Sequence, residues 1–203
     1  MGFYERQILP RVIDLMLRGE PIDRLRRDTA SGLSGEVLEV GFGSGRNVPF
    51  YPPGLQRVRA VDPAVVGREL AAARVAASPV PIDYIGLDGE SLPLPADSVD
   101  HVLTTWTLCT IGDVDRALGE IRRVLRPGGE LHFVEHGLSP EAKVARLQRR
   151  LTPVQRRLFG GCRLDRSTTD VIERAGLELV SVETFYLKGP KFMGYLTAGV
   201  ARI

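Results

Sequence analysis

The chain has 203 residues, of which 43% are hydrophobic and 26% are charged, and its formal net charge at pH 7 is +2. This length and composition predict one globular domain, residues 1–203, and the small net charge gives no reason to expect nucleic acid as a partner. Two cysteines are too few for a disulfide framework, no run reaches the roughly 18 apolar residues of a membrane span, and the first residues lack a signal-peptide core. We therefore expect a cytoplasmic protein without a transmembrane segment.

Two helices are expected before the first strand. Apolar residues recur at helical spacing over residues 3–18, and a second, shorter helix is expected over residues 21–30. Helices in this place can cover a crevice at the edge of a sheet, so we expect residues 1–34 to form a helical lid, with Tyr4 as a candidate contact. Plain packing against the sheet is the alternative.

A glycine-rich loop follows the first strand, residues 36–40. Its glycines stand at alternate positions, Gly41, Gly43 and Gly45, and an acidic residue, Glu39, precedes them. Strand, glycine loop and helix form the layout of a nucleotide-binding crevice, and we expect a helix over residues 46–51. A dinucleotide fingerprint would need a small residue where Arg46 stands. The spacing is instead that of loops that bind S-adenosylmethionine (SAM), although another nucleotide or a tight structural turn remains open.

Acidic residues follow the next two strands. Strand 58–61 ends in Asp62-Pro63, and a carboxylate 21 positions after Gly41 can accept both hydroxyls of a ribose. Asp62 can also cap the helix expected over residues 64–77. Strand 81–85 leads to Asp88-Gly89-Glu90, where an acid can accept from an adenine amine or can merely cap a turn.

The fourth and fifth strands supply the remaining candidates. Strand 99–104 leads into Thr105-Trp106, and the tryptophan can contact the methionine part of SAM, contact a substrate or pack in the core. Strand 130–135 ends at His136, on the same edge as the glycine loop. His136 is therefore the histidine placed to act as a base or to orient a substrate, although an isolated histidine is usually structural. His101 falls at the opposite edge, and His132 is expected in the core.

The sequence after the fifth strand indicates a helical insertion and two further strands. Residues 141–159 read as two amphipathic helices, with a break at Thr152-Pro153, and we expect residues 138–166 to form a helical insertion over the substrate. Its arginine-rich face is solvated, contacts a membrane surface or binds an anionic substrate, and the sequence leaves these alternatives open. Strands are expected over residues 179–186 and 192–201, with the last one antiparallel.

The chain resembles the class I SAM-dependent methyltransferases. Four motifs carry the resemblance: residues 38–45, 60–63, 88–93 and 124–129. The resemblance implies an α/β, Rossmann-like three-layer sandwich with a seven-stranded, mostly parallel sheet whose last strand is antiparallel. It implies SAM as cofactor and S-adenosyl-L-homocysteine as product. The candidate cofactor-binding residues are Glu39, Gly41, Phe42, Gly43, Gly45, Asp62, Pro63, Asp88, Gly89, Glu90, Thr105 and Trp106.

Two groups within this class compete. Leu108-Cys109 and residues 133–136 and 159–166 look like small methyltransferases related to the alkyl-thiol S-methyltransferases, whereas residues 88–93 resemble the ubiquinone/menaquinone C-methyltransferases. The resemblance implies methyl transfer to a small molecule, possibly a thiol. A C- or O-methyltransferase of a quinone or phenol is the alternative, and a non-catalytic SAM- or nucleotide-binding domain is the second. Arg46 disfavours a nicotinamide oxidoreductase.

The sequence shows no metal-ligand spacing, so no metal is expected and a metal-assisted catechol O-methyltransferase is disfavoured. Cys109 and Cys162 are expected to be small buried packing residues.

Overall fold

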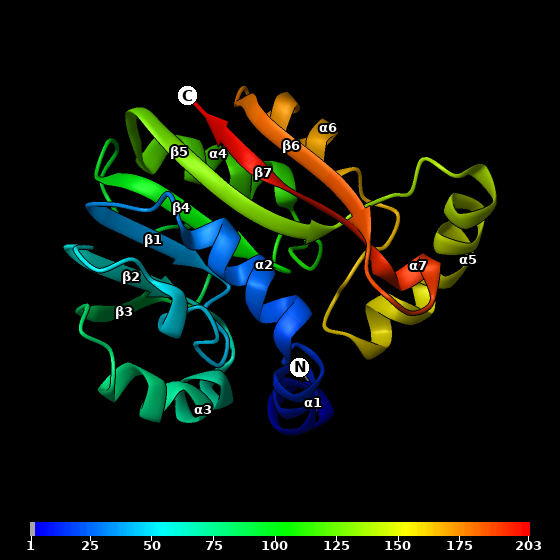
Figure 1. Ribbon diagram of the computed structural model, residues 1–203, viewed down its shortest axis with the longest axis horizontal. Coiled ribbons are helices and arrows are strands. Elements are labelled where there is room, and N and C mark those ends of the chain that lie inside the picture. Colours follow the sequence, from blue (N-terminus) through cyan, green and yellow to red (C-terminus); the bar gives the residue numbers. More distant parts are fainter. Residues whose placement is uncertain (1–2) are drawn as a thin grey trace.

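The computed structural model describes residues 3–203 and contains a seven-stranded sheet in the order β3-β2-β1-β4-β5-β7-β6 (Figure 1). Strands β1 to β5 run parallel, while β7 lies between β5 and β6 and is antiparallel to both. The seven-stranded, mostly parallel sheet with an antiparallel last strand is confirmed. The strands are β1 (Glu36–Val40), β2 (Arg57–Val61), β3 (Ile82–Gly86), β4 (Val99–Thr105), β5 (Leu125–His136), β6 (Glu178–Tyr186) and β7 (Tyr195–Arg202).

Helices cover both faces of the sheet (Figure 1). Side chains alternate along each strand, so Leu38 and Val102 join a core cluster with one set of helices, while Val37 and Leu103 join a cluster on the other face. The first face is covered by α4 (Val114–Val124) and α6 (Thr168–Arg174), and the second by α2 (Glu20–Ala30) and α3 (Val65–Ala76).

Helix α4 illustrates how the local sequence sets an element. Asp113 caps it by accepting a hydrogen bond of 3.0 Å from the amide of Arg116. Leu118 and Ile121 stand at helical spacing and are fully buried against the sheet. Each such side chain contributes about 1.5–3 kcal/mol to folding.

Two N-terminal elements differ from the sequence expectation. The first helix divides into a π-helical turn, η1 (Tyr4–Ile8), and α1 (Leu9–Met16), because Pro10 in the first turn of α1 has no amide hydrogen to donate. The helix expected over residues 46–51 is only a 3₁₀ turn, η2 (Val48–Phe50), which contains Pro49.

Two C-terminal elements also differ. Helix α5 (Ala142–Leu158) continues through Pro153, so the expected break was wrong. The Thr152 hydroxyl does not cap a new helix but donates to the carbonyl of Gln148 over 2.9 Å. The last segment begins with a short helix, α7 (Lys191–Gly194), before β7.

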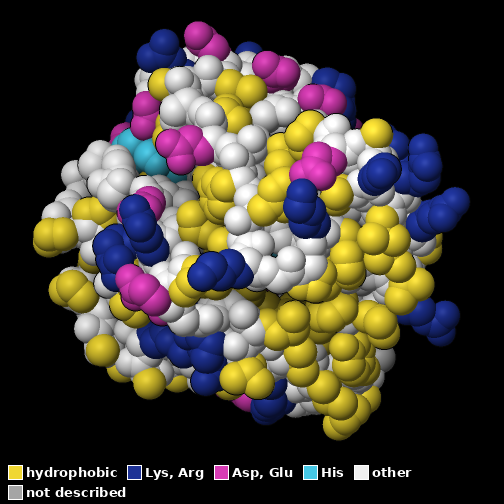
Figure 2. All heavy atoms as spheres, turned by 45° about the vertical axis from the view of Figure 1, so that its right-hand side comes forward, with side chains coloured by type: hydrophobic (Ala, Val, Ile, Leu, Met, Phe, Trp, Pro, Cys, Tyr) yellow, Lys and Arg dark blue, Asp and Glu magenta, His cyan; other side chains and the backbone are white. Residues whose placement is uncertain are grey.

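Apolar side chains are exposed on the N-terminal elements and on α5, and Figure 2 shows hydrophobic side chains gathered on one face with lysines and arginines along its margin. The hydroxyl of Tyr4 donates to the carbonyl of Leu158 over 2.9 Å, which joins η1 to the end of α5. Within residues 3–203, no helix has the length and apolar character needed to cross a bilayer.

Candidate active site

A cavity of about 910 Å³ opens where the parallel strands end. The glycine loop, the loops after β2, β3 and β4, helix α1 and the chain at Phe159-Gly160 form its walls. This volume is at the upper end of the range for small-molecule sites. The strand ends therefore border a cavity with room for a nucleotide-sized ligand together with a small second molecule.

The glycine loop folds back over the end of β2. The amides of Gly41 and Phe42 both donate to the carbonyl of Val61, over 2.8 and 3.2 Å. Gly41 has a φ of +81°, and a Cβ at this position would lie 1.9 Å from the Thr107 hydroxyl oxygen. A side chain here would meet both the backbone strain and that clash, so glycine is required. Gly43 brings the loop close to helix α3, because its carbonyl packs directly against Gly67 of that helix.

Asp62, at the end of β2, hydrogen-bonds to the glycine loop. It is 7% exposed, and its two carboxylate oxygens accept from the amides of Gly43 and Ala64, each over 2.7 Å. Burial raises the pKa of Asp62, and these two amide hydrogen bonds offset part of the rise. Asp62 also lines the cavity beside Pro63. Its oxygens retain lone pairs, so the capping role and the predicted ribose role are compatible.

Glu39 lies beneath the loop and does not line the cavity. It is 1% exposed, and it accepts from the side-chain amide of Asn47 over 2.9 Å and from the Tyr51 hydroxyl. Burial raises the pKa of Glu39 to about 7 despite these hydrogen bonds. Glu39 thus supports the loop from within the core. Gly45 is also absent from the cavity lining, and its amide closes a turn onto the Phe42 carbonyl.

Arg26 is a cavity residue that the sequence reasoning missed. It is 4% exposed, and one Nη atom donates to Asn47 Oδ1 over 2.8 Å and to Thr105 Oγ1 over 3.0 Å. Its guanidinium lies over the Trp106 ring, 4.8 Å from the centroid. The buried Nε has no hydrogen-bond partner among the described residues. Burial lowers the pKa of Arg26 to about 10, so the side chain remains cationic at pH 7 and can bind an anionic group.

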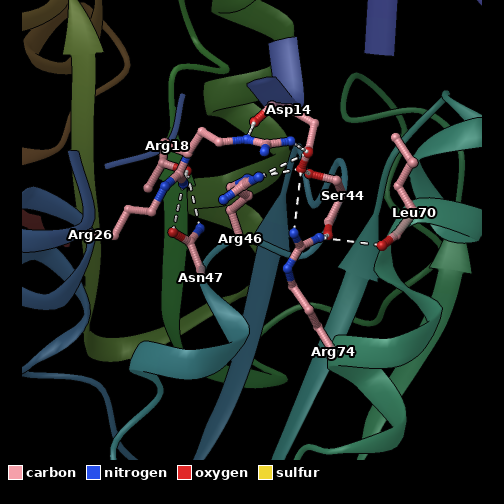
Figure 3. Close-up of polar contacts among 9 residues, drawn as sticks. Asp14, Arg18, Arg26, Ser44, Arg46, Asn47, Leu70 and Arg74 are labelled. Atoms are coloured by element: carbon pink, nitrogen blue, oxygen red, sulfur yellow. Dashed lines mark hydrogen bonds and ion pairs between the residues drawn. The ribbon is translucent and has the colours of Figure 1, made fainter. Parts of the chain in front are cut away.

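Helix α1 is fastened across the glycine loop by Asp14 (Figure 3). Its carboxylate accepts from the Ser44 hydroxyl over 2.7 Å and from two nitrogens of Arg46 over 2.8 Å each. Arg18 and Arg74 also lie within ion-pair distance. Burial by itself would raise the pKa of Asp14, but the hydrogen bonds from Arg46 and Ser44 outweigh it and hold the pKa well below its usual range.

The docked helix contributes the apolar side chains of Leu9 and Ile13 to the cavity, and Leu17, which directly follows the helix, contributes a third. Tyr4, the contact expected from the sequence, does not line the cavity.

The loop after β4 forms the wall opposite Asp62. Trp106 is 8% exposed and has a φ of +52°, a strained conformation of the kind found at functional sites. Glu135 is fully buried behind this loop and accepts from the amides of Thr107 and Cys109, over 3.0 and 3.2 Å. Arg166 donates to the carbonyls of Leu108 and Ile111. Thr105 and Trp106 thereby line the cavity in fixed positions.

The loop after β3 closes the other end of the cavity. Asp88 is exposed, lines the cavity and accepts from the amide of Glu90 over 2.8 Å. Glu90 lines the cavity as well and accepts from the amide of Asp113, which ties this loop to the start of α4. A Cβ on Gly89 would lie 2.9 Å from a methyl group of Val40, so this position favours glycine.

His136 does not line the cavity. Its Nδ1 atom lies 3.8 Å from the sulfur of Cys109 and 3.7 Å from that of Cys162, and the two sulfurs are 3.9 Å apart. Both cysteines are buried and free. Contact with Cys109, and then with His136, lowers the pKa of the Cys162 thiol. His132 lies in the core and contacts the carbonyl of Thr29.

Comparison with known proteins defines the class. A family model described as a methyltransferase domain matches residues 38–133. A methyltransferase of known structure from Bacillus halodurans superposes with a TM-score of 0.74, covering 90% of this chain and 99% of that one at 17% identity. The chain is a SAM-dependent methyltransferase with the Rossmann-like fold of that class.

Two relatives narrow the assignment. The human protein named thiol S-methyltransferase TMT1A is 34% identical over 178 residues, which make up 81% of this chain and 72% of that protein. The rat protein named thiol S-methyltransferase TMT1B is 38% identical over 159 residues. That match covers 75% of this chain and 64% of the rat protein. This protein belongs to the family of small methyltransferases that includes TMT1A and TMT1B.

Proposed function

We propose that the protein binds SAM in the cavity and transfers its methyl group to the sulfur of a small thiol. The relatives TMT1A and TMT1B, both named for thiol S-methylation, support the thiol as acceptor. The observation that best supports the cofactor site is Arg26, a buried cation that lines the cavity and whose Nε has no hydrogen-bond partner within residues 3–203.

The donor groups of the cavity fit the parts of SAM. The cationic Arg26 would take the carboxylate of the methionine end. Asp62, whose oxygens retain acceptor capacity, would take the ribose hydroxyls. Asp88 and the backbone around Gly89 would take the adenine amine and ring nitrogens. Leu87, at the same end of the cavity, is 51% exposed and supplies apolar surface for the ring.

The protein's contribution to the reaction is alignment and exclusion of water. When bound, SAM supplies a methyl group that its sulfonium has already activated. A thiol with a pKa of about 8.5 is partly thiolate at neutral pH. After releasing its proton to solvent, the acceptor sulfur would form the new carbon–sulfur bond, while the methyl–sulfur bond of the sulfonium breaks and S-adenosylhomocysteine leaves. Helix α1 and Phe159 line the cavity and would cover bound SAM. The reaction requires no protein base, and His136 does not line the cavity.

Calorimetric titration tests the cofactor site. Native protein should bind SAM and S-adenosylhomocysteine, and should not bind NAD. Asp62→Ala and Arg26→Met should each weaken SAM binding by about 1–3 kcal/mol, because each removes a partner of a buried polar group. Asp83→Ala, which removes an exposed aspartate of β3, is the matched control and should bind as the native protein does. Binding of NAD in place of SAM would reject the proposal.

A panel of acceptors tests the thiol. Small alkyl thiols, phenols and quinols are each incubated with SAM, and formation of S-adenosylhomocysteine is followed together with the mass of the product. We expect a methyl thioether from the thiols only. Methylation restricted to phenols or quinols would establish the alternative C- or O-methyltransferase. SAM binding without turnover of any acceptor would favour a non-catalytic SAM-binding domain.

The proposed compartment is the cytoplasm, which the two free thiols support. Peripheral contact with a membrane is a second element of the proposal. Leu147 and Val154 of α5 are 42% and 56% exposed among solvent-facing arginines such as Arg150. Cosedimentation with anionic lipid vesicles should therefore decrease in a Leu147→Asp, Val154→Asp variant. Equal cosedimentation of the variant and the native protein would reject the contact.

A further inference from the structure

Three groups that can ligate a metal meet at the carboxyl edge of the sheet, beside the cavity. Cys109 comes from the loop after β4, His136 from the end of β5 and Cys162 from the loop after α5. Their ligand atoms all lie within 4.8 Å of one another. The residues are far apart in sequence, so no spacing of the metal-binding kind reveals them.

The three distances match one face of a tetrahedral site. With zinc–sulfur and zinc–nitrogen bonds of about 2.3 and 2.0–2.1 Å, a tetrahedral ion separates two sulfurs by about 3.8 Å and a sulfur from a nitrogen by about 3.6 Å. The observed separations are 3.9 Å between the sulfurs, and 3.8 and 3.7 Å between the sulfurs and Nδ1. An ion can therefore be inserted with small shifts of the side chains.

The surroundings also suit a metal ion. Cys109 and Cys162 are 1% and 4% exposed, and two thiolates with a neutral imidazole would balance the charge of a divalent ion. The amide of Cys109 donates a hydrogen bond of 3.2 Å to the buried carboxylate of Glu135. Hydrogen bonds of this kind hold metal ligands in place.

A second cluster offers a contrast. His101, Glu130 and His132 also lie within 4.8 Å of one another, at the opposite edge of the sheet. Their ring nitrogens contact Ser34, Thr29, Glu130 and each other. These side chains already satisfy one another, whereas the Nδ1 of His136 faces only the two sulfurs among the contacts of the described residues.

We propose that Cys109, His136 and Cys162 form a binding site for a divalent metal ion that prefers sulfur and nitrogen ligands, with Zn²⁺ as the ion of choice. Three protein ligands leave the fourth tetrahedral position for water or a small ligand. Binding converts both thiols to thiolates and releases their protons. The ion joins the loop after β4 to the loop after α5. It thus fixes Thr110 and Gly160, which line the cavity.

Metal content of the 203-residue protein tests the site directly. The protein is stripped with a chelator under a non-thiol reductant, loaded with Zn²⁺ or Co²⁺, and freed of excess ion by gel filtration. We expect about one ion per chain. The Co²⁺ form should show a thiolate-to-metal charge-transfer band and the intense visible bands of tetrahedral cobalt. Absence of bound metal, or a cobalt spectrum without the charge-transfer band, overturns the proposal.

Variants assign the ligands. Cys109→Ser and Cys162→Ser each remove one of the two thiolates, so each should lower the metal content and weaken the charge-transfer band, and the double variant should lose the band entirely. His136→Gln should weaken Zn²⁺ binding at least about tenfold. His101→Gln removes the second cluster and should leave both the metal content and the spectrum unchanged. Loss of metal in His101→Gln with retention in the cysteine variants would also overturn the proposal. SAM titration of the stripped native protein runs in parallel, so failure of the metal site is distinguishable from failure of the cofactor site.

Discussion

At the scale of single residues, Gly41 carries the strictest requirement in the cavity. Its φ of +81° and the 1.9 Å separation between an added Cβ and the Thr107 hydroxyl oxygen predict that Gly41→Ala destabilises the fold by about 2–5 kcal/mol. Urea unfolding monitored by circular dichroism measures this loss. Gly54→Ala is the matched control. Gly54 has a φ of +104°, but apart from its chain neighbours no atom of residues 3–203 would lie within 4 Å of an added Cβ. Equal losses of stability in the two variants would show that the loss comes from backbone strain alone and not from the clash with Thr107.

Residues with a local signal were predictable, and those that act through tertiary contacts were not. The position of Asp62 at the cavity was predictable, because the residue follows a strand at a set distance from the glycine loop. Arg26 was missed because sequence reasoning treats a charged residue as solvated. It nevertheless stands at helical spacing from Ile22 and Thr29, on the face of α2 that packs toward the sheet, and an arginine in such a place is a usable signal. The contact of His136 with two cysteines depends on loop conformations that no spacing encodes.

At the scale of elements, the docking of α1 depends on Asp14. Asp14→Asn removes the charge that holds Ser44, Arg46 and Arg74, so α1 should detach more readily from the glycine loop. We expect SAM to dissociate about 5–100-fold faster, which corresponds to a loss of about 1–3 kcal/mol from a hydrogen-bonded ion pair. Stopped-flow displacement of SAM by S-adenosylhomocysteine measures the rate. Asp28→Asn disrupts an exposed ion pair on α2 and should leave the rate unchanged. An unchanged rate in Asp14→Asn would mean that α1 does not control access.

The strands followed from their apolar sequences because both faces of the parallel sheet are buried. The course of the helices was harder to predict where the sequence contains proline. In α5, Gln148 and Gln155 are buried on either side of Pro153, and the side chain of Gln148 donates to the carbonyl of Gly137. Tertiary contacts therefore outweigh the local preference for a break. The capping pattern of residues 152–155 depends on local sequence alone, so it could not reveal these contacts.

At the scale of the whole molecule, a buried acid makes stability depend on pH. Burial raises the pKa of Glu39 to about 7, above its ordinary value of 4.5. Between these values the folded protein binds a proton that the unfolded chain has released. The contribution of Glu39 is therefore fully present below about pH 4.5 and is lost as the pH rises to about 7. The shift in the pKa of Glu39 changes the free energy of unfolding by about 3 kcal/mol at most.

Glu39→Gln should remove that dependence. The free energy of unfolding of the variant, relative to the native protein, should rise by up to about 3 kcal/mol between about pH 4.5 and about pH 8, as measured by urea unfolding without SAM. Glu120→Gln is the matched control. Hydrogen bonding to Arg123 lowers the pKa of Glu120 to about 2, so its contribution is lost only as the pH falls below 4.5. The difference between Glu120→Gln and the native protein should then stay constant over the same range. A constant difference for Glu39→Gln as well would mean that Glu39 is ionised in the folded protein throughout this range. The burial of Glu39 beneath the glycine loop would in that case be offset by the positive charge of Arg26.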